Sequence, residues 1–180
     1  MMEKLSAPFI LERRFAAPRE LVYAALTEAT HLARWMSPAG MELSHCTVEA
    51  KVGGAFHYAM RPVGMADVPA MWGKWTFREL SPPERLVVVV QFSDQDGGVT
   101  RHPMAPSWPL YTLSTTMLTT LPEATPTTLM RLEWRTVDAS AAEQASFDAA
   151  HAGMAQGWGG TMDQLEKYLA EVIARSAGNS

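Results

Sequence analysis

We identify four candidate side chains for acid–base catalysis in this sequence: His151, Tyr58, Tyr111 and Glu133. A desolvated pocket shifts the pKa values of such groups and directs their protons, as a cyclase or hydrolase type of reaction requires. Alternation along its strand places Glu133 on the outer face, where a solvated salt bridge is the stronger interpretation. His151 with a tyrosine is therefore the catalytic hypothesis, and a core histidine bonded to a neighbour is the simpler alternative.

Nucleophilic and metal-dependent chemistry have weaker support. Cys46, the single cysteine, lies on an alternating strand, where a buried and unreactive thiol is expected. The segment 94–97 begins like a calcium loop and lacks the later acidic ligands, which indicates a turn. His45, His57 and His102 do not have the spacing of a zinc helix. No glycine pair has the strand-to-helix context of a phosphate site, so we predict no metal and no cofactor.

A long amphipathic helix must position His151. From Ala141 to about Arg175, apolar residues recur at steps of three and four, the spacing of one helical face: Phe147, Met154, Trp158, Met162, Leu165, Leu169 and Val172. His151 falls on this stripe and is expected to face a sheet. Glycines at positions 153, 157, 159 and 160 each cost roughly 1 kcal/mol relative to alanine. Close backbone approach, a kink or room for a bound molecule would each explain them.

Alternating residues earlier in the chain predict the sheet. A first strand covers Phe9 to Phe15, a helix opens at 17–20, Thr30 caps a second short helix, and strands occupy the stretch 41–137. Inward faces of these strands and of the terminal helix point toward one volume. If the rings do not fill that volume, the remainder is an apolar ligand pocket. Its candidate ligand-binding residues are Trp35, Tyr58, Met60, Trp75, Phe77, Phe92, Tyr111, Trp134, His151, Met154 and Trp158.

Composition and charge exclude several classes of protein. The 180 residues are 47% hydrophobic with a formal net charge of −4 and no basic run, which disfavours nucleic acid as a partner. No apolar stretch reaches the length of a signal peptide or a membrane span, and the single cysteine makes no use of an oxidising compartment. We therefore predict a cytoplasmic protein without membrane insertion. The length fits a single domain over 1–180, with its core at about 8–174 and a frayed tail at 176–180.

Five short strings spread from about residue 8 to 172 form a fairly specific set, although each is weak alone. They are 14–22; Trp35 followed by Pro38 and Gly40; 52–56; Gly73 followed by 80–87; and Gly157-Trp158 followed by 162–165. Together these strings resemble the activator of 90-kDa heat-shock-protein ATPase homologue family. The strings mark turns and packing positions, so the resemblance implies a fold and transfers no catalytic residues.

The fold that this resemblance implies is α+β, of the START-like helix-grip type in the SRPBCC superfamily. In that fold a curved antiparallel sheet, here of about six or seven strands, wraps around a long C-terminal helix and encloses an apolar cavity. Two short helices follow the first strand. The implied arrangement agrees with the strand and helix patterns read from the residues themselves.

Three functions are compatible with these patterns. The first is binding of a small hydrophobic or aromatic molecule in the cavity between sheet and terminal helix. The second is a cyclase or hydrolase type of enzyme that uses His151 and a tyrosine in the same cavity. The third is a protein-interaction module, a chaperone regulator or a homodimer, that uses exposed Trp72 or Trp108. Rim loops at 61–70 and 93–110 could act as surface loops, as a lid or as an interface.

Overall fold

The computed structural model describes residues 7–179. Residues 1–6 and 180, which include both ends of the predicted domain and the last residue of the predicted tail, lie outside the described residues. The strands are β1 (Phe9–Phe15), β2 (Met41–Val48), β3 (Ala55–Pro62), β4 (Met71–Ser81), β5 (Arg85–Ser93), β6 (Val99–Thr100), β7 (Tyr111–Thr120) and β8 (Thr128–Val137). The helices are α1 (Arg19–Thr27), α2 (Ala29–Trp35), α3 (Ala141–Ala149) and α4 (His151–Gly178).

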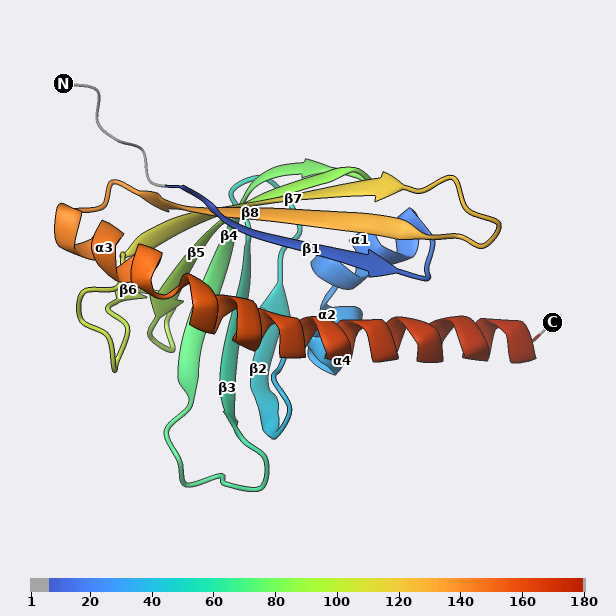
Figure 1. Cartoon of the computed structure of the whole chain (residues 1–180). Coiled ribbons are helices and arrows are strands. Elements are labelled where there is room, and N and C mark those ends of the chain that lie inside the picture. Colours follow the sequence, from blue (N-terminus) through green and yellow to red (C-terminus); the bar gives the residue numbers. More distant parts are fainter. Residues whose placement is uncertain (1–6, 180) are drawn as a thin grey trace.

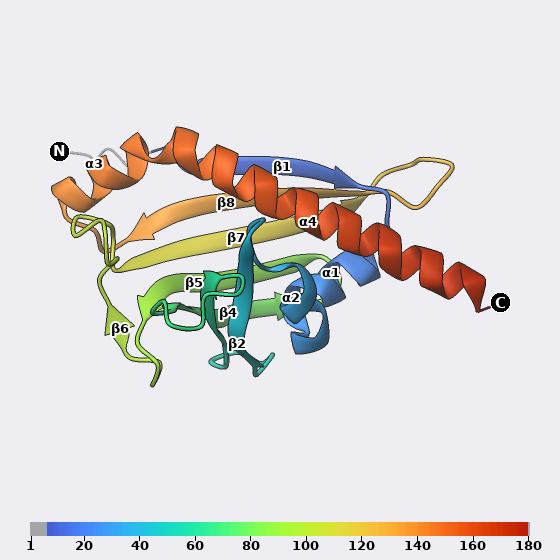
Figure 2. The same ribbon diagram turned by 90° about the horizontal axis from the view of Figure 1, so that it is seen from below.

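Within residues 7–179 the strands form one antiparallel sheet in the order β1-β8-β7-β5-β4-β3-β2, and the two-residue β6 pairs with β5. The sheet curves, and α4 runs across its concave face in both views (Figures 1 and 2). This arrangement confirms the predicted α+β fold, with a curved antiparallel sheet gripping a long C-terminal helix.

The two short helices connect opposite edges of the sheet, because β1 and β2 are the two end strands. Pro18 is the N-cap of α1, and Glu20 places a carboxylate in its first turn, where it complements the helix dipole. The expected cap of the second helix at Thr30 is wrong: α2 begins at Ala29, and Glu28 is its N-cap. The Trp35 indole N–H donates to the Ala25 carbonyl at 2.8 Å, which fixes α2 on α1.

The predicted terminal helix is divided at Ala150 into α3 and α4. A capping box starts α3, in which Ser140 accepts from the Glu143 backbone N–H and the Glu143 carboxylate accepts from the Ser140 N–H. At the other end, helical structure continues to Gly178, beyond the start of the tail expected at 176–180. The Ser176 hydroxyl donates to the Val172 carbonyl within this last segment.

The apolar stripe of the terminal helix faces the sheet and the short helices, as the spacing predicted. Phe147, Met162, Leu165 and Leu169 are fully buried, and the remaining stripe residues, Met154, Trp158 and Val172, are half-buried. Burial of such side chains stabilises the fold by about 1.5–3 kcal/mol each relative to exposure. The helix therefore has a firmly packed middle and a less covered segment near residues 153–160.

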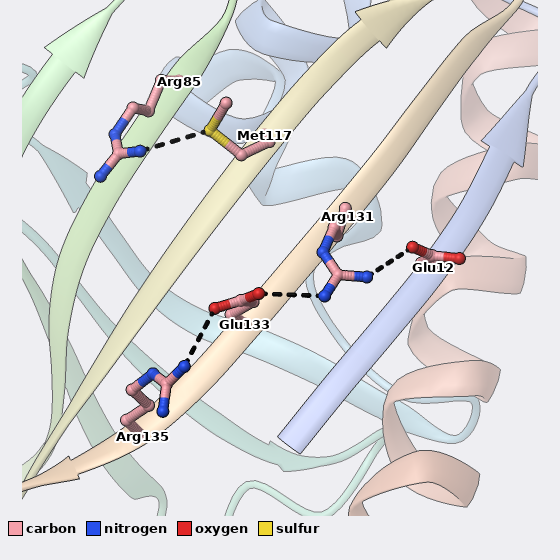
Figure 3. A network of polar contacts seen from close by, with 6 residues as sticks. All are labelled: Glu12, Arg85, Met117, Arg131, Glu133 and Arg135. Carbon is pink, nitrogen blue, oxygen red and sulfur yellow. Dashed lines mark hydrogen bonds and ion pairs between the residues drawn. The ribbon is translucent and has the colours of Figure 1, made fainter. Parts of the chain in front are cut away.

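The outer face of the sheet carries charged side chains on β1 and β8 (Figure 3). The Arg131 guanidinium donates to Glu12 at 2.6 Å and to Glu133 at 3.0 Å, and Arg135 donates to Glu133 at 3.4 Å. The Arg131 hydrogen bond lowers the pKa of the Glu133 carboxyl below its ordinary value. Glu133 is thus an outward ion-pair partner, as alternation predicted, and it plays no part in the interior.

Candidate functional site

A cavity of about 620 Å³ lies between the concave face of the sheet and the helices, and it is partly open to solvent. This volume is within the roughly 300–1,000 Å³ of small-molecule sites. Strands β3, β4, β5, β7 and β8, helices α3 and α4, and two loops contribute to its walls. The lining residues are Met36, Pro38, Tyr58, Met60, Met71, Val90, Gln91, Phe92, His102, Trp108, Thr112, Trp134, Ala149, Ala150, Gly153, Met154, Gly157, Trp158 and Thr161.

Tyr58 forms part of the sheet side of the cavity because Gly73 leaves space for its ring. Strand pairing sets Tyr58 opposite Gly73, and Gly73 opposite Phe92. A Cβ atom at Gly73 would lie 2.5 Å from the Tyr58 hydroxyl oxygen, so any other residue there would displace the ring. Burial raises the pKa of Tyr58 to about 12, and the nearby Trp75 indole acts in the opposite direction. The Trp75 indole N–H is close enough to oppose this rise but does not form a hydrogen bond to Tyr58. The phenol is therefore protonated at neutral pH.

Two of the helix glycines form part of the opposite wall. Gly153 and Gly157 line the cavity, and a Cβ atom at either position would meet no atom within 4 Å. Close backbone approach therefore does not explain these glycines, whereas room beside the helix does. Gly159 and Gly160 also have open space and do not line the cavity. Glycine at 153 and 157 destabilises the helix, and the absence of a side chain at these positions enlarges the cavity.

A smaller and more enclosed chamber of about 30 Å³ adjoins the cavity, and both are lined by Val90, Trp134 and Trp158. The rings of Trp134 and Trp158 meet edge to face with centroids 5.4 Å apart. Ser114 and Thr116 of β7 contribute small side chains to the chamber. Its volume is sufficient for about one or two water-sized groups.

The loop between β5 and β7 adds His102 and Trp108 to the cavity wall. The His102 ring lies against Phe92 with centroids 4.5 Å apart, and Trp108 packs on Phe147 with centroids 5.5 Å apart. The Met104 backbone N–H donates to His102 Nδ1 at 3.0 Å. Burial lowers the pKa of His102, and contact with its own backbone acts in the opposite direction. Sequence reasoning missed both residues as cavity components, because an irregular loop has no periodicity that reveals where its side chains point.

The family profile described as Activator of Hsp90 ATPase homolog 1-like protein matches residues 16–170. The chain belongs to this family. The resemblance read from the five strings is thereby confirmed. No curated protein matches the chain.

Solved structures similar to this family member share its fold. A protein from Staphylococcus epidermidis is 22% identical with a TM-score of 0.71, covering 95% of this chain and 94% of its own. A protein from Arthrobacter aurescens is 24% identical with a TM-score of 0.70, covering 92% and 87%. The AHSA1 protein from Silicibacter pomeroyi is 15% identical with a TM-score of 0.65, covering 91% and 98%. At these identities the likeness concerns the fold alone.

The structure brings most of the predicted site residues to the walls of the cavity or of the adjoining chamber. Those that line the large cavity are Tyr58, Met60, Phe92, Trp134, Met154 and Trp158. Trp35 and Trp75 line the inner chamber instead. Phe77, Tyr111 and His151 line neither space.

The three remaining residues are placed elsewhere for identifiable reasons. Tyr111 was expected to point inward, which is wrong: it is 36% exposed, and its neighbour Thr112 is the buried residue that faces inward. Phe77 faces inward and is completely enclosed by the packed core. His151 lies between the rings of Phe9 and Phe147, with centroid distances of 5.7 and 5.2 Å. Its Nε2 atom is buried without a hydrogen-bond partner, outside the cavity.

Other features of this family member bear on the remaining sequence predictions. Cys46 is half-buried, its thiol approaches the Ala29 carbonyl at 3.9 Å, and burial raises its pKa, which disfavours the reactive thiolate. Among residues 7–179, no group of three or more His, Cys, Asp or Glu side chains could hold a metal ion. No helix in the described part of the chain has the length and apolar character needed to cross a membrane.

Arg101 fastens the β5–β7 loop to the start of α3, and we call this set of contacts the Arg101 latch. Its guanidinium donates to the Glu143 carboxylate at 2.5 Å and to the carbonyls of Pro106 and Trp108 at 3.4 Å. The hydrogen bond from Arg101 and those from Ser140 lower the pKa of Glu143 to about 2. Because the folded-state pKa is depressed, the latch is complete above the ordinary carboxyl range and is lost as pH falls toward 2.

An Arg101→Ala variant is expected to loosen the loop that carries His102 and Trp108. Amide hydrogen exchange across 101–108 should become several-fold faster, while the global stability changes little because the ion pair is near the surface. Arg135→Ala is the matched control, since it removes an ion pair on the outer face. Equal exchange rates in wild type and Arg101→Ala would contradict the latch.

Proposed function

We propose that this protein binds a small, uncharged hydrophobic or aromatic molecule in the cavity between sheet and helix. The observation that carries the proposal is the cavity itself, whose lining residues in the described chain include no Asp, Glu, Lys or Arg. Burying an unpaired ionised group in such surroundings is costly, so an uncharged molecule is favoured. Tryptophan, phenylalanine, tyrosine and methionine side chains supply apolar and polarizable contacts.

Helix α4 provides independent support for this proposal. Alanine at Gly153 and Gly157 would meet no obstructing atom and would favour the helix by roughly 1 kcal/mol per site. Glycines at these positions therefore lower helix stability and enlarge the cavity. Both positions are exposed at the wall of the open cavity, and a protein with no cavity to keep open would gain helix stability from side chains there.

Titration with the neutral aromatic probe N-phenyl-1-naphthylamine tests the proposal. We expect saturable binding of one probe per chain, with energy transfer from the wall tryptophans Trp108, Trp134 and Trp158. At a free probe concentration 100 times Kd, the free energy of unfolding should rise by about 2.7 kcal/mol.

The anionic relative 1-anilinonaphthalene-8-sulfonate is the control probe for charge. It should bind more weakly, because its sulfonate would have to remain in solvent or enter a cavity wall without cationic side chains. Absence of saturable binding of the neutral probe to the folded protein would contradict the proposed function.

The alternative functions rest on His151, Trp72 and Trp108. A cyclase or hydrolase based on His151 is not favoured, because that ring is enclosed between Phe9 and Phe147. For the interaction hypothesis, Trp108 belongs to the cavity wall, whereas Trp72 stacks on His57 at 4.9 Å on the outer face. A homodimer or chaperone partner there stays a prediction, as does the cytoplasmic location.

A further inference from the structure

We propose that His102 Nε2–H donates a hydrogen bond to an acceptor oxygen of the bound molecule. The cavity would thus select uncharged aromatic molecules that carry a carbonyl oxygen over hydrocarbons of the same shape. This inference rests on the proposed function and specifies its ligand class. It is carried by the position of His102 in the cavity wall and by the hydrogen bond that its other ring nitrogen makes.

The Met104 backbone determines which nitrogen of His102 carries the proton. Its N–H donates to Nδ1 at 3.0 Å, which requires the lone pair of Nδ1. A neutral imidazole has one donor and one acceptor nitrogen, so Nε2 is the donor. Burial, which lowers the pKa of His102, favours this neutral form.

Nε2 is free to meet a ligand. It makes no hydrogen bond to any group in the part of the chain described, and it is not among the fully covered polar atoms that lack a partner. The Phe92 ring beside His102 holds the imidazole at the cavity wall. Tyr58 and Phe92 are paired with Gly73 from its two neighbouring strands, and both line the cavity together with His102. A flat ring against these side chains could present its oxygen to Nε2.

Two probes of nearly equal shape separate the hydrogen bond from apolar burial: 2-acetylnaphthalene, which has a carbonyl oxygen, and 2-ethylnaphthalene, which has none. The measured quantity is the ratio of their Kd values in each protein, because hydration differences between the probes cancel when ratios are compared. In His102→Leu the ratio is expected to move against the ketone by about tenfold, the effect of losing one buried hydrogen bond.

His102→Gln provides the matched rescue, since the glutamine side-chain amide can place an N–H donor close to the position of Nε2. The ratio in this variant should remain near the wild-type value. In the wild type, the nitrogen resonance of Nε2 should also shift on binding the ketone and much less on binding the hydrocarbon.

The outcomes distinguish this inference from the proposed function. If both probes bind and the ratio is the same in wild type, His102→Leu and His102→Gln, the hydrogen bond from His102 is refuted while the cavity function stands. If neither probe binds the folded wild type, both are refuted. A ratio that moves in His102→Leu and is restored in His102→Gln supports the assignment.

Discussion

A Gly157→Leu variant should be at least as stable as the wild type and bind N-phenyl-1-naphthylamine roughly tenfold or more weakly. A side chain at 157 begins in open space at the cavity wall, so leucine can extend into the volume that the probe needs. The same change replaces a poor helix former, which raises the free energy of unfolding by up to about 1 kcal/mol. Urea unfolding and probe titration measure the two effects separately.

Gly160→Leu is the matched control for this variant. Position 160 is in the same helix, is exposed, has equal space for a Cβ atom and does not line the cavity. The stability of the control should therefore change in the same direction, and its probe affinity should stay at the wild-type value. Unaltered binding by correctly folded Gly157→Leu would show that the probe occupies another site.

A Phe77→Ala variant is expected to lose about 3–5 kcal/mol of stability, because it removes a large side chain from a fully packed environment. Phe77 is 0% exposed and belongs to the main core cluster. Since it lines neither the cavity nor the inner chamber, the folded protein should retain its probe affinity. Denaturant unfolding, followed by titration under conditions where the variant is folded, measures both quantities.

Phe77→Leu keeps the test informative if the alanine variant does not fold, because typical stabilities are only about 5–15 kcal/mol. Leucine preserves most of the volume and should cost about 1–1.5 kcal/mol. A selective loss of probe affinity in Phe77→Leu without loss of stability would place Phe77 at the ligand, as its sequence position first indicated.

The fold could be predicted because periodicity and burial agree along most of the chain. Leu165 and Leu169 of the helical stripe are buried where their spacing placed them, and alternation on β8 correctly put Trp134 inside and Glu133 outside. The start of α2 was missed because Glu28 lacks a side-chain cap bond, so the polar residue two positions later gave a misleading signal. Local capping chemistry is thus a weaker guide than the apolar pattern.

The candidate site was only partly predictable, since the larger hydrophobic side chains of a strand do not always point inward. On β7 three polar residues, Thr112, Ser114 and Thr116, face inward together with Leu118, whereas the larger Tyr111 and Met117 are exposed. Small inward side chains there lie beside bulky neighbours: Thr112 pairs with Val90, and Ser114 pairs with Trp134. At these positions bulky side chains of the adjacent strands already occupy the volume on the inner face, which leaves room there only for small β7 side chains. The sequence of β7 alone does not show how much of that volume its neighbours fill.

His151 and the loop residues show a second limit of sequence reasoning. His151 does face the sheet, as its helical position predicted, and meets Phe9 of the edge strand instead of the cavity. The cavity histidine is His102, whose position depends on contacts across the chain such as the Arg101 latch. Periodicity assigns a face of an element; it does not assign which part of a curved sheet that face meets.

The strand order determines when each strand of the nascent chain can pair. Phe9 of β1 pairs with Trp134 of β8, more than a hundred positions later, so the first strand emerges from the ribosome long before its backbone partner. The β2-to-β5 hairpins can form meanwhile, with their aromatic inner face still uncovered. Such long-range pairing slows folding and leaves strand edges open to aggregation. Synthesis of the last third of the chain therefore completes the sheet and covers its inner face in one late stage.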